Sequence, residues 1–139
     1  MQTTHPSKSL VVGLWVAQIL LALTFAGTAI WKLATPRAAL ATMIPWTGEV
    51  SARLFYFTAA ADLAGGLGVL LPSATRIAPR LAALAALGCA VLQLSAIVFH
   101  VSRGEVVNTW FNLLLVALSL FVAWGRGTRS TPPPSQSQT

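Results

Sequence analysis

The residue in this chain best placed to do chemistry is Asp62, the only carboxylate inside any of four long apolar runs. It lies near the middle of the second run, Leu54–Leu71. An ionised Asp at the centre of a membrane helix costs about 2.5–3.5 kcal/mol on insertion scales, so it normally faces the interior of a bundle and has a partner there. Since an apolar residue would avoid this cost, we interpret Asp62 as a functional residue.

Further polar or small residues recur at helical spacing on one face of each run. They are Gln18, Thr28 and Lys32 in the first run, Thr58, Asp62, Gly65 and Gly66 in the second, Cys89, Gln93 and His100 in the third, and Asn108, Asn112 and Ser119 in the fourth. Lipid offers these groups no hydrogen bonds, so we expect the four faces to turn inward and enclose one polar interior.

The depth of Asp62 follows from the same spacing. Asp62 lies nine residues after Arg53, and Gln93 lies ten residues before Arg103. At 1.5 Å per residue both should lie about 13–15 Å below the same membrane boundary.

Nearer that boundary we expect a second group of polar side chains, namely Lys32, His100, Asn108 and Asn112. Together these residues predict a polar funnel that opens outward and has Asp62 at its floor.

Most of these residues also have a purely structural interpretation. Gln93 and Asn112 are of the kind that joins membrane helices by hydrogen bonds, at about 0.6 kcal/mol per contact. Lys32 is able to extend its amine to the head groups, and His100 can cap a helix end. Cys89 suits a small core position.

The environment is set by composition, because 55% of the 139 residues are hydrophobic, 9% are charged and the mean hydropathy is +0.72. These values predict an integral membrane protein, all-α, folded as an up-down-up-down four-helix bundle. We expect one membrane domain over residues 1–126, with spans at about 10–31, 54–71, 81–101 and 108–124, followed by a disordered cytoplasmic tail over 127–139. The distribution of Lys and Arg between the two sides places both termini in the cytoplasm.

Two connections between the runs are informative. Pro36 suits the start of a helix, so Arg37–Met43 is interpreted as a short helix at the membrane interface, although a plain surface loop fits equally well. Pro72–Arg80 is expected to be a tight polar turn on the cytoplasmic side.

Several mechanisms are excluded by residue counts. The single cysteine, Cys89, cannot form an intramolecular dithiol, and His100 is the only histidine in the apolar region, which rules out bis-histidine haem within one chain. No Cys/His cluster has the spacing of a metal site. The net charge of +6 is dispersed at the ends of the runs, where it matches lipid head groups, so nucleic acid is not an expected partner.

The arrangement of motifs resembles the DoxX-like family over roughly Leu10–Arg126. The resemblance rests on Asp62-Leu-Ala-Gly65-Gly66-Leu-Gly-Val-Leu-Leu71-Pro72, Arg76, His100-Val-Ser-Arg103-Gly104-Glu105, the Gly125-Arg126 end of the last run, and Lys32-Leu33 at the end of the first. The chain departs from the family pattern at Asp62, where Glu is usual, and at Ala29, where Gly is usual.

The resemblance implies a multi-pass protein of the bacterial cell (inner) membrane. Named relatives are associated with a thiosulfate:quinone oxidoreductase and with membrane complexes that handle thiol or oxidative stress. The recurring polar positions of the family fall here on Lys32, Asp62, His100, Arg103 and Glu105.

The leading hypothesis is a redox-associated membrane subunit whose funnel binds a quinone or a similar small amphipathic molecule. Asp62 and His100 would be the catalytic residues, and no metal site is expected. The residues that would bind the ligand are Lys32, Thr58, Gln93, Arg103, Glu105, Asn108 and Asn112. The chain carries no redox centre, so electrons would come from a soluble or membrane partner protein or from a bound flavin.

Three other functions are compatible with the same residues. A cofactor-free acid–base enzyme would act on a lipid-soluble substrate through Asp62 and His100. A proton-coupled transporter of small cations or drugs would use Asp62 as its shared site, and a scaffold would pair Asp62 with Lys32 or another cation. The many Ala and Gly residues also permit a homodimer.

Overall fold

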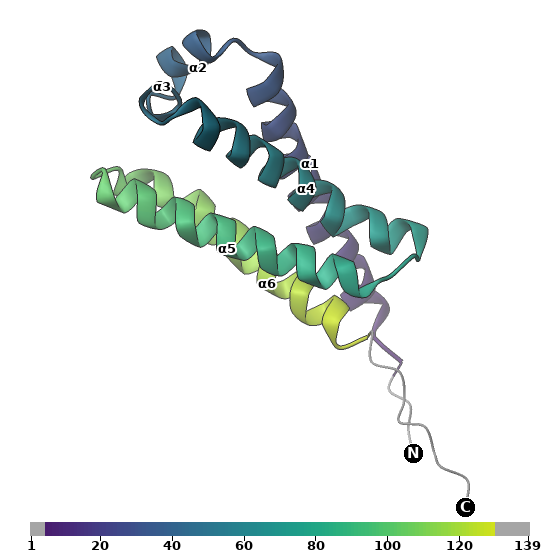
Figure 1. Ribbon diagram of the computed structural model, residues 1–139. Helices are drawn as coiled ribbons and strands as arrows, with labels where there is room; N and C mark the ends of the chain where they lie inside the picture. The colour runs from purple at the N-terminus through teal and green to yellow at the C-terminus, as the bar shows by residue number, and fades with distance from the viewer. Residues whose placement is uncertain (1–4, 130–139) are drawn as a thin grey trace, which may run out of the picture.

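The computed structural model describes residues 5–129 and, over that range, consists of helices without a strand (Figure 1). The elements in chain order are α1 (Lys8–Ala34), α2 (Arg37–Met43), α3 (Trp46–Glu49), α4 (Ala52–Thr75), α5 (Arg80–Ser102), the 3₁₀ helix η1 (Val106–Asn108) and α6 (Thr109–Gly127). This confirms the all-α prediction.

Four segments within the described residues are long and apolar enough to cross a membrane, namely Lys8–Ala34, Ala52–Thr75, Arg80–Ser102 and Val106–Gly127. The surface of the bundle agrees with a lipid environment. Large apolar side chains such as Leu23, Phe57 and Val98 are each more than 60% exposed and point outward. A protein surrounded by water rarely presents so much apolar surface, so this is a multi-pass membrane protein.

Local sequence explains where the helices begin. Ser7 caps α1 by accepting a hydrogen bond from the backbone N–H of Leu10 at 3.3 Å, and Ser51 caps α4 in the same way from Leu54 at 3.2 Å. Each hydroxyl satisfies one of the backbone donors that a helix N-terminus leaves without an intrahelical partner.

The prediction that the turn begins at Pro72 is wrong, because the turn begins four residues later, at Arg76. Helix α4 continues through Pro72 to Thr75, and the chain turns at Arg76, whose φ of 58° is left-handed. Proline removes one backbone hydrogen bond, a small loss in the last turn of a helix and one that membrane helices often tolerate.

Two other expectations concern short segments. Arg37–Met43 is the helix α2, which decides between helix and loop in favour of helix. Gly127 still belongs to α6, and residues 130–139 of the predicted tail lie outside the described residues.

Side-chain contacts show that α1 and α4 run antiparallel. Lys32 near the end of α1 contacts Asp62, whereas Gln18 earlier in α1 contacts Ser73, later in α4. The bundle consists of two closely packed helix pairs, α1 with α4 and α5 with α6, which approach each other at one end and diverge toward the end that carries α2 and α3 (Figure 1).

Small residues allow the close approach in the middle of the bundle. A Cβ atom at Gly66 of α4 would lie 2.7 Å from the backbone nitrogen of Ala26 in α1, and one at Gly65 would lie 2.8 Å from the Cys89 sulfur in α5. Glycine at both positions therefore permits the close contact of α4 with α1 and α5.

The end of the bundle where the pairs meet is called here the closed half. Gln18 is its centre, fully buried, and donates from Nε2 to the Val69 carbonyl at 2.6 Å and to Ser73 Oγ at 2.9 Å. Its Oε1 accepts from Arg126 Nε of α6 at 2.8 Å. Because one amide joins α1, α4 and α6, the two pairs are held together at this end.

Candidate functional site

The other end of the bundle, called here the open half, contains the buried ion pair of Lys32 and Asp62. Lys32 Nζ lies 2.7 Å from Asp62 Oδ2, and the two side chains are each 9% exposed. Lys32 comes from the last turn of α1 and Asp62 from the middle of α4. Lys32 also donates to Thr58 Oγ1 at 3.4 Å, one helical turn before Asp62.

Burying two charges is costly, and their attraction compensates for it only when the geometry is good and further hydrogen bonds are made. The pair therefore stabilises the fold only as long as both partners are present. Removal of either one would leave a charge in an apolar environment.

A cavity of about 430 Å³ lies beside this ion pair, between the two helix pairs. Its wall is mostly apolar and includes Phe25, Ile44, Trp46, Val50, Leu54, Leu92, Phe99, Phe111 and Leu115. Polar groups on the wall come from all four long helices and include Thr24, Thr28, Lys32, Thr58, Asp62, Gln93, His100 and Asn112. This volume and this mixture are typical of a site for a small, largely apolar organic molecule.

Aromatic residues close one side of the cavity. Trp46 of α3 meets Phe99 of α5 edge to face with ring centroids 6.0 Å apart, and Lys32 Nζ lies 5.4 Å from the centre of the Trp46 ring. Trp46 thereby bridges Lys32 of the ion pair, on α1, and Phe99 of the facing wall, on α5.

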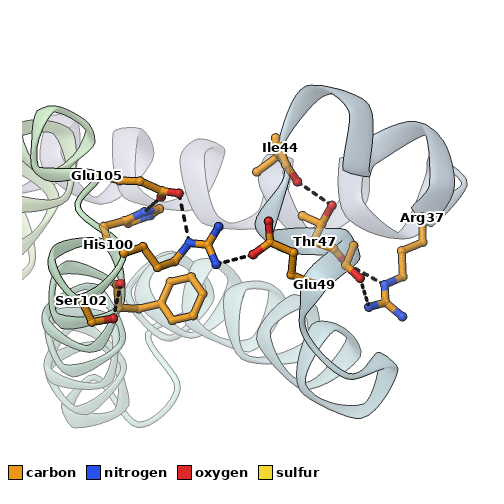
Figure 2. Close-up of polar contacts among 10 residues, drawn as sticks. Arg37, Ile44, Thr47, Glu49, His100, Ser102 and Glu105 are labelled. Atoms are coloured by element: carbon orange, nitrogen blue, oxygen red, sulfur yellow. Dashed lines mark hydrogen bonds and ion pairs between the residues drawn. The ribbon is translucent and has the colours of Figure 1, made fainter.

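Helices α2 and α3, the second of which begins with Trp46, form a unit held by Arg37. Arg37 Nε donates to the Thr47 carbonyl at 2.7 Å, and its Nη2 donates to the carbonyl of Val50, while Thr47 Oγ1 donates to the Ile44 carbonyl at 2.8 Å (Figure 2). Backbone carbonyls that no helix satisfies are thus bonded by one guanidinium.

A network of charged side chains lies next to the cavity, where α5 ends. Figure 2 shows the imidazole of His100 beside Glu105, with Nδ1 2.8 Å from Oε2. Arg103 Nε donates to Glu105 Oε1 at 3.0 Å, and its Nη1 pairs with Glu49 at the end of α3. Arg103 therefore connects the α2–α3 unit to the end of α5.

These contacts alter the acidities of the network outside the helices. The hydrogen bond from Arg103 lowers the pKa of Glu49 below its ordinary value. Hydrogen bonds from His100 and then Arg103 lower the pKa of Glu105, and the two carboxylates in turn raise the pKa of Arg103, with Glu49 contributing most. Both carboxylates are ionised near neutral pH.

The structure brings six of the nine predicted site residues to the cavity wall, namely Lys32, Thr58, Asp62, Gln93, His100 and Asn112. Arg103 and Glu105 do not line it and instead form the network beside it. Asn108 is exposed at the end of η1, away from the cavity wall.

Sequence reasoning missed the aromatic wall and the role of Glu49. The signal for Glu49 was available, because the chain has only three carboxylates and the four predicted spans put the connections that contain Glu49 and Arg103 on the same side of the membrane. Trp46, Phe99 and Phe111 gave no comparable signal, since exposed aromatic residues at the ends of membrane helices are common.

Among the described residues, no three His, Cys, Asp or Glu side chains gather in a way that holds a metal ion.

Comparison with known protein families identifies the family of this chain. The family model of the DoxX-like family matches residues 16–122, which include the ion pair, the cavity wall and the charged network. No curated protein and no solved structure matches the chain. Because the match covers most of the four membrane helices, this chain belongs to the DoxX-like family.

Proposed function

We propose that the protein binds a quinone or a similar small amphipathic molecule in the cavity of the open half, as a redox-associated subunit of a membrane system. The observation that carries the proposal is the Lys32–Asp62 pair, a buried donor and acceptor that lies on the wall of a mostly apolar cavity. An apolar ring fits the aromatic wall, while polar atoms on the ring fit the ion pair and His100.

Asp62 and His100 are the residues proposed to exchange protons with this ligand. Reduction of a quinone to a quinol takes up two electrons and two protons, and side chains with exchangeable protons supply only the latter. The electrons would come from a soluble or membrane redox partner, or from a flavin bound elsewhere.

The orientation in the membrane belongs to the same proposal. With both termini in the cytoplasm, the open half and its charged network would face the outer side of a bacterial inner membrane. A ligand dissolved in the bilayer would then exchange protons with the water on that side.

A second candidate function is a cofactor-free acid–base enzyme that acts on a lipid-soluble substrate. It is favoured by the same observation, because Asp62 and His100 line one cavity and neither needs an electron donor. Transport and scaffolding are the remaining alternatives, and a homodimer is compatible with each of them.

The test is the binding of a short-chain benzoquinone to the purified protein in lipid nanodiscs, followed by quenching of tryptophan fluorescence. We expect saturable quenching that is weakened in Asp62→Asn and in His100→Ala. Trp46→Phe serves as the matched control for the probe, since it removes the tryptophan on the cavity wall and should remove much of the quenching while leaving the other four tryptophans.

The outcomes separate the candidates. Unchanged binding in both Asp62→Asn and His100→Ala would show that the quinone does not bind in this cavity. Absence of saturable binding in the wild type would overturn ligand binding of this class, and proton-driven uptake into vesicles would then test the transporter.

A further inference from the structure

His100 is a residue of the cavity wall whose hydrogen-bonding role is fixed from outside the cavity. It lies in the last turn of α5 and lines the cavity, whereas its partner Glu105 lies beyond the helix end and does not. Glu105 is held in turn by Arg103, which binds its other carboxylate oxygen at 3.0 Å. The carboxylate is therefore positioned before any ligand arrives.

This contact determines which nitrogen of the imidazole carries the proton. An ionised carboxylate only accepts hydrogen bonds, so Nδ1, 2.8 Å from Glu105 Oε2, must be the protonated nitrogen. In a neutral imidazole the other nitrogen, Nε2, then has a free lone pair and accepts a hydrogen bond. Within residues 5–129, no partner of Nε2 is found.

Asn112 supplies a complementary observation on α6. It lines the same cavity, and its Nδ2 is buried without an acceptor among the described residues. A buried amide donor without a partner is unfavourable, and an oxygen atom of a ligand would satisfy it. Two residues of the wall thus offer a ligand complementary groups, an acceptor on His100 of α5 and, on Asn112 of α6, a donor that lacks an acceptor among the described residues.

Building on the function proposed above, we infer that the cavity selects the hydroxyl form of its ligand, a phenol or hydroquinone, over the quinone. A ring hydroxyl donates its proton to His100 Nε2, and its oxygen atoms are acceptors for Asn112. A quinone has acceptors only, so it would leave the lone pair of Nε2 without a donor. Glu105 acts here as a positioning residue, because it sets the tautomer of His100 without touching the ligand.

The inference is tested with three matched compounds, a short-chain alkyl hydroquinone, its dimethyl ether and its quinone. Affinities are measured by isothermal titration calorimetry in nanodiscs, without oxygen and at about pH 8. Empty nanodiscs correct for partition into lipid. We expect the wild type to bind the hydroquinone about fivefold more tightly than either other compound, the effect of one hydrogen bond.

The variants ask whether this preference depends on the tautomer. In Glu105→Gln the amide can donate to Nδ1, which moves the imidazole proton to Nε2, and we expect the preference for the hydroquinone to disappear. His100→Phe keeps an aromatic ring and should lose the preference as well. Glu49→Gln is the control, because it weakens the same Arg103 network without touching His100, and it should keep the preference.

Because the ratio of affinities is taken within each variant, a general loss of stability does not imitate the expected result. A preference that survives in both Glu105→Gln and His100→Phe, or equal affinities in the wild type, would overturn the inference while leaving the binding site in place. Failure of all three compounds to bind saturably would overturn the proposed function together with the inference.

Discussion

The two ends of the bundle use buried polar groups in opposite ways. In the closed half, the amide of Gln18 donates to the Val69 carbonyl and to Ser73 and accepts from Arg126. In the open half, Lys32 and Asp62 neutralise each other, but they do so on the wall of a cavity, and Asn112 has a donor without an acceptor in the described part of the chain. Complete pairing is what a structural contact requires, whereas unused donors and acceptors beside an empty space are typical of a binding site.

The difference teaches how a chain this small can be both stable and able to bind. The closed half holds the two helix pairs together. The pairs can therefore stay apart in the open half while the bundle remains folded. Variants of the two halves should therefore affect different measurements, stability in the first and binding in the second, except at the ion pair.

The largest effect is expected at the ion pair, which contributes both to stability and to the proposed binding site. Lys32→Met should lower the free energy of unfolding by about 3 kcal/mol, because it leaves the Asp62 carboxylate buried without a partner. The measurement is unfolding in mixed detergent micelles, followed by circular dichroism.

The double variant Lys32→Met with Asp62→Leu is the matched control. It removes both charges and should recover most of the lost stability, whereas quinone binding should stay lost. A single variant as stable as the wild type would show that the pair is not buried in the membrane.

The next largest effect is expected at the helix contact between the two halves. Gly66→Ala should destabilise the protein by about 1–3 kcal/mol, because the new Cβ would meet the backbone of Ala26 at 2.7 Å and the carbonyl oxygen of Ala22 at 3.1 Å, neither of which can rotate away. The same unfolding measurement applies.

Gly88→Ala provides the comparison within the same bundle. Within residues 5–129, nothing lies within 4 Å of a Cβ at Gly88 in α5, so the change should be neutral or stabilise the helix by up to about 1 kcal/mol. Equal effects at Gly66 and Gly88 would contradict the close approach of α1 and α4.

Much of the open half could be predicted from the sequence because helical spacing is reliable inside a membrane. The polar faces of the apolar runs predicted that Lys32, Thr58, Asp62, Gln93 and His100 face one polar interior, and all five line the cavity. A polar residue in lipid has few positions where it is satisfied, so its position in the helix also indicates the direction it faces.

At the site, the failures occur where the backbone stops being a regular α-helix. Asn108 was assigned to the same face as Asn112, but the 3₁₀ helix η1 ends at Asn108 and has a different number of residues per turn, so the two side chains diverge. Gly104 turns the chain with a φ of 75°, which brings Glu105 back toward His100 in a way that spacing does not indicate.

Partners across helices were also beyond the sequence. Gln18 was placed on the inward face of the first run, but its bond to Arg126 joins residues 108 positions apart. Periodicity assigns a direction to each side chain and leaves open which residue of another helix it meets.

A smaller effect is expected from Gln18→Leu, which tests the closed half alone. The substitution removes the hydrogen bonds of Gln18 to three partners, Val69, Ser73 and Arg126, and should lower the free energy of unfolding by about 1–2 kcal/mol, since polar contacts between membrane helices average about 0.6 kcal/mol each. Quinone affinity should stay within about twofold of the wild type, because Gln18 does not line the cavity.

Ser119→Ala is the control for this change. Ser119 is fully buried on α6 and its hydroxyl has no partner among the described residues, so its loss should leave stability unchanged. A loss of binding in Gln18→Leu comparable to that in Asp62→Asn would contradict the separation of the two halves.

The smallest effect is expected from acid acting on the charged network of the open half. Glu49 and Glu105 have folded-state pKa values below their ordinary value of 4.5, so the contribution of their ion pairs is complete above pH 4.5 and is lost as the pH falls through the lowered values. Arg103 stays charged throughout, so protonation of the carboxylates alone releases the α2–α3 unit from the end of α5.

Hydrogen exchange of residues 37–50, corrected for the intrinsic rates, should show protection falling in this acid range, while the protection of α4 around Val69 is kept. The variant Glu49→Gln should begin with reduced protection of the α2–α3 unit at neutral pH and lose little more in acid. An equal acid-induced loss in that variant would mean that the α2–α3 unit is held by Trp46 and Phe99 rather than by charge.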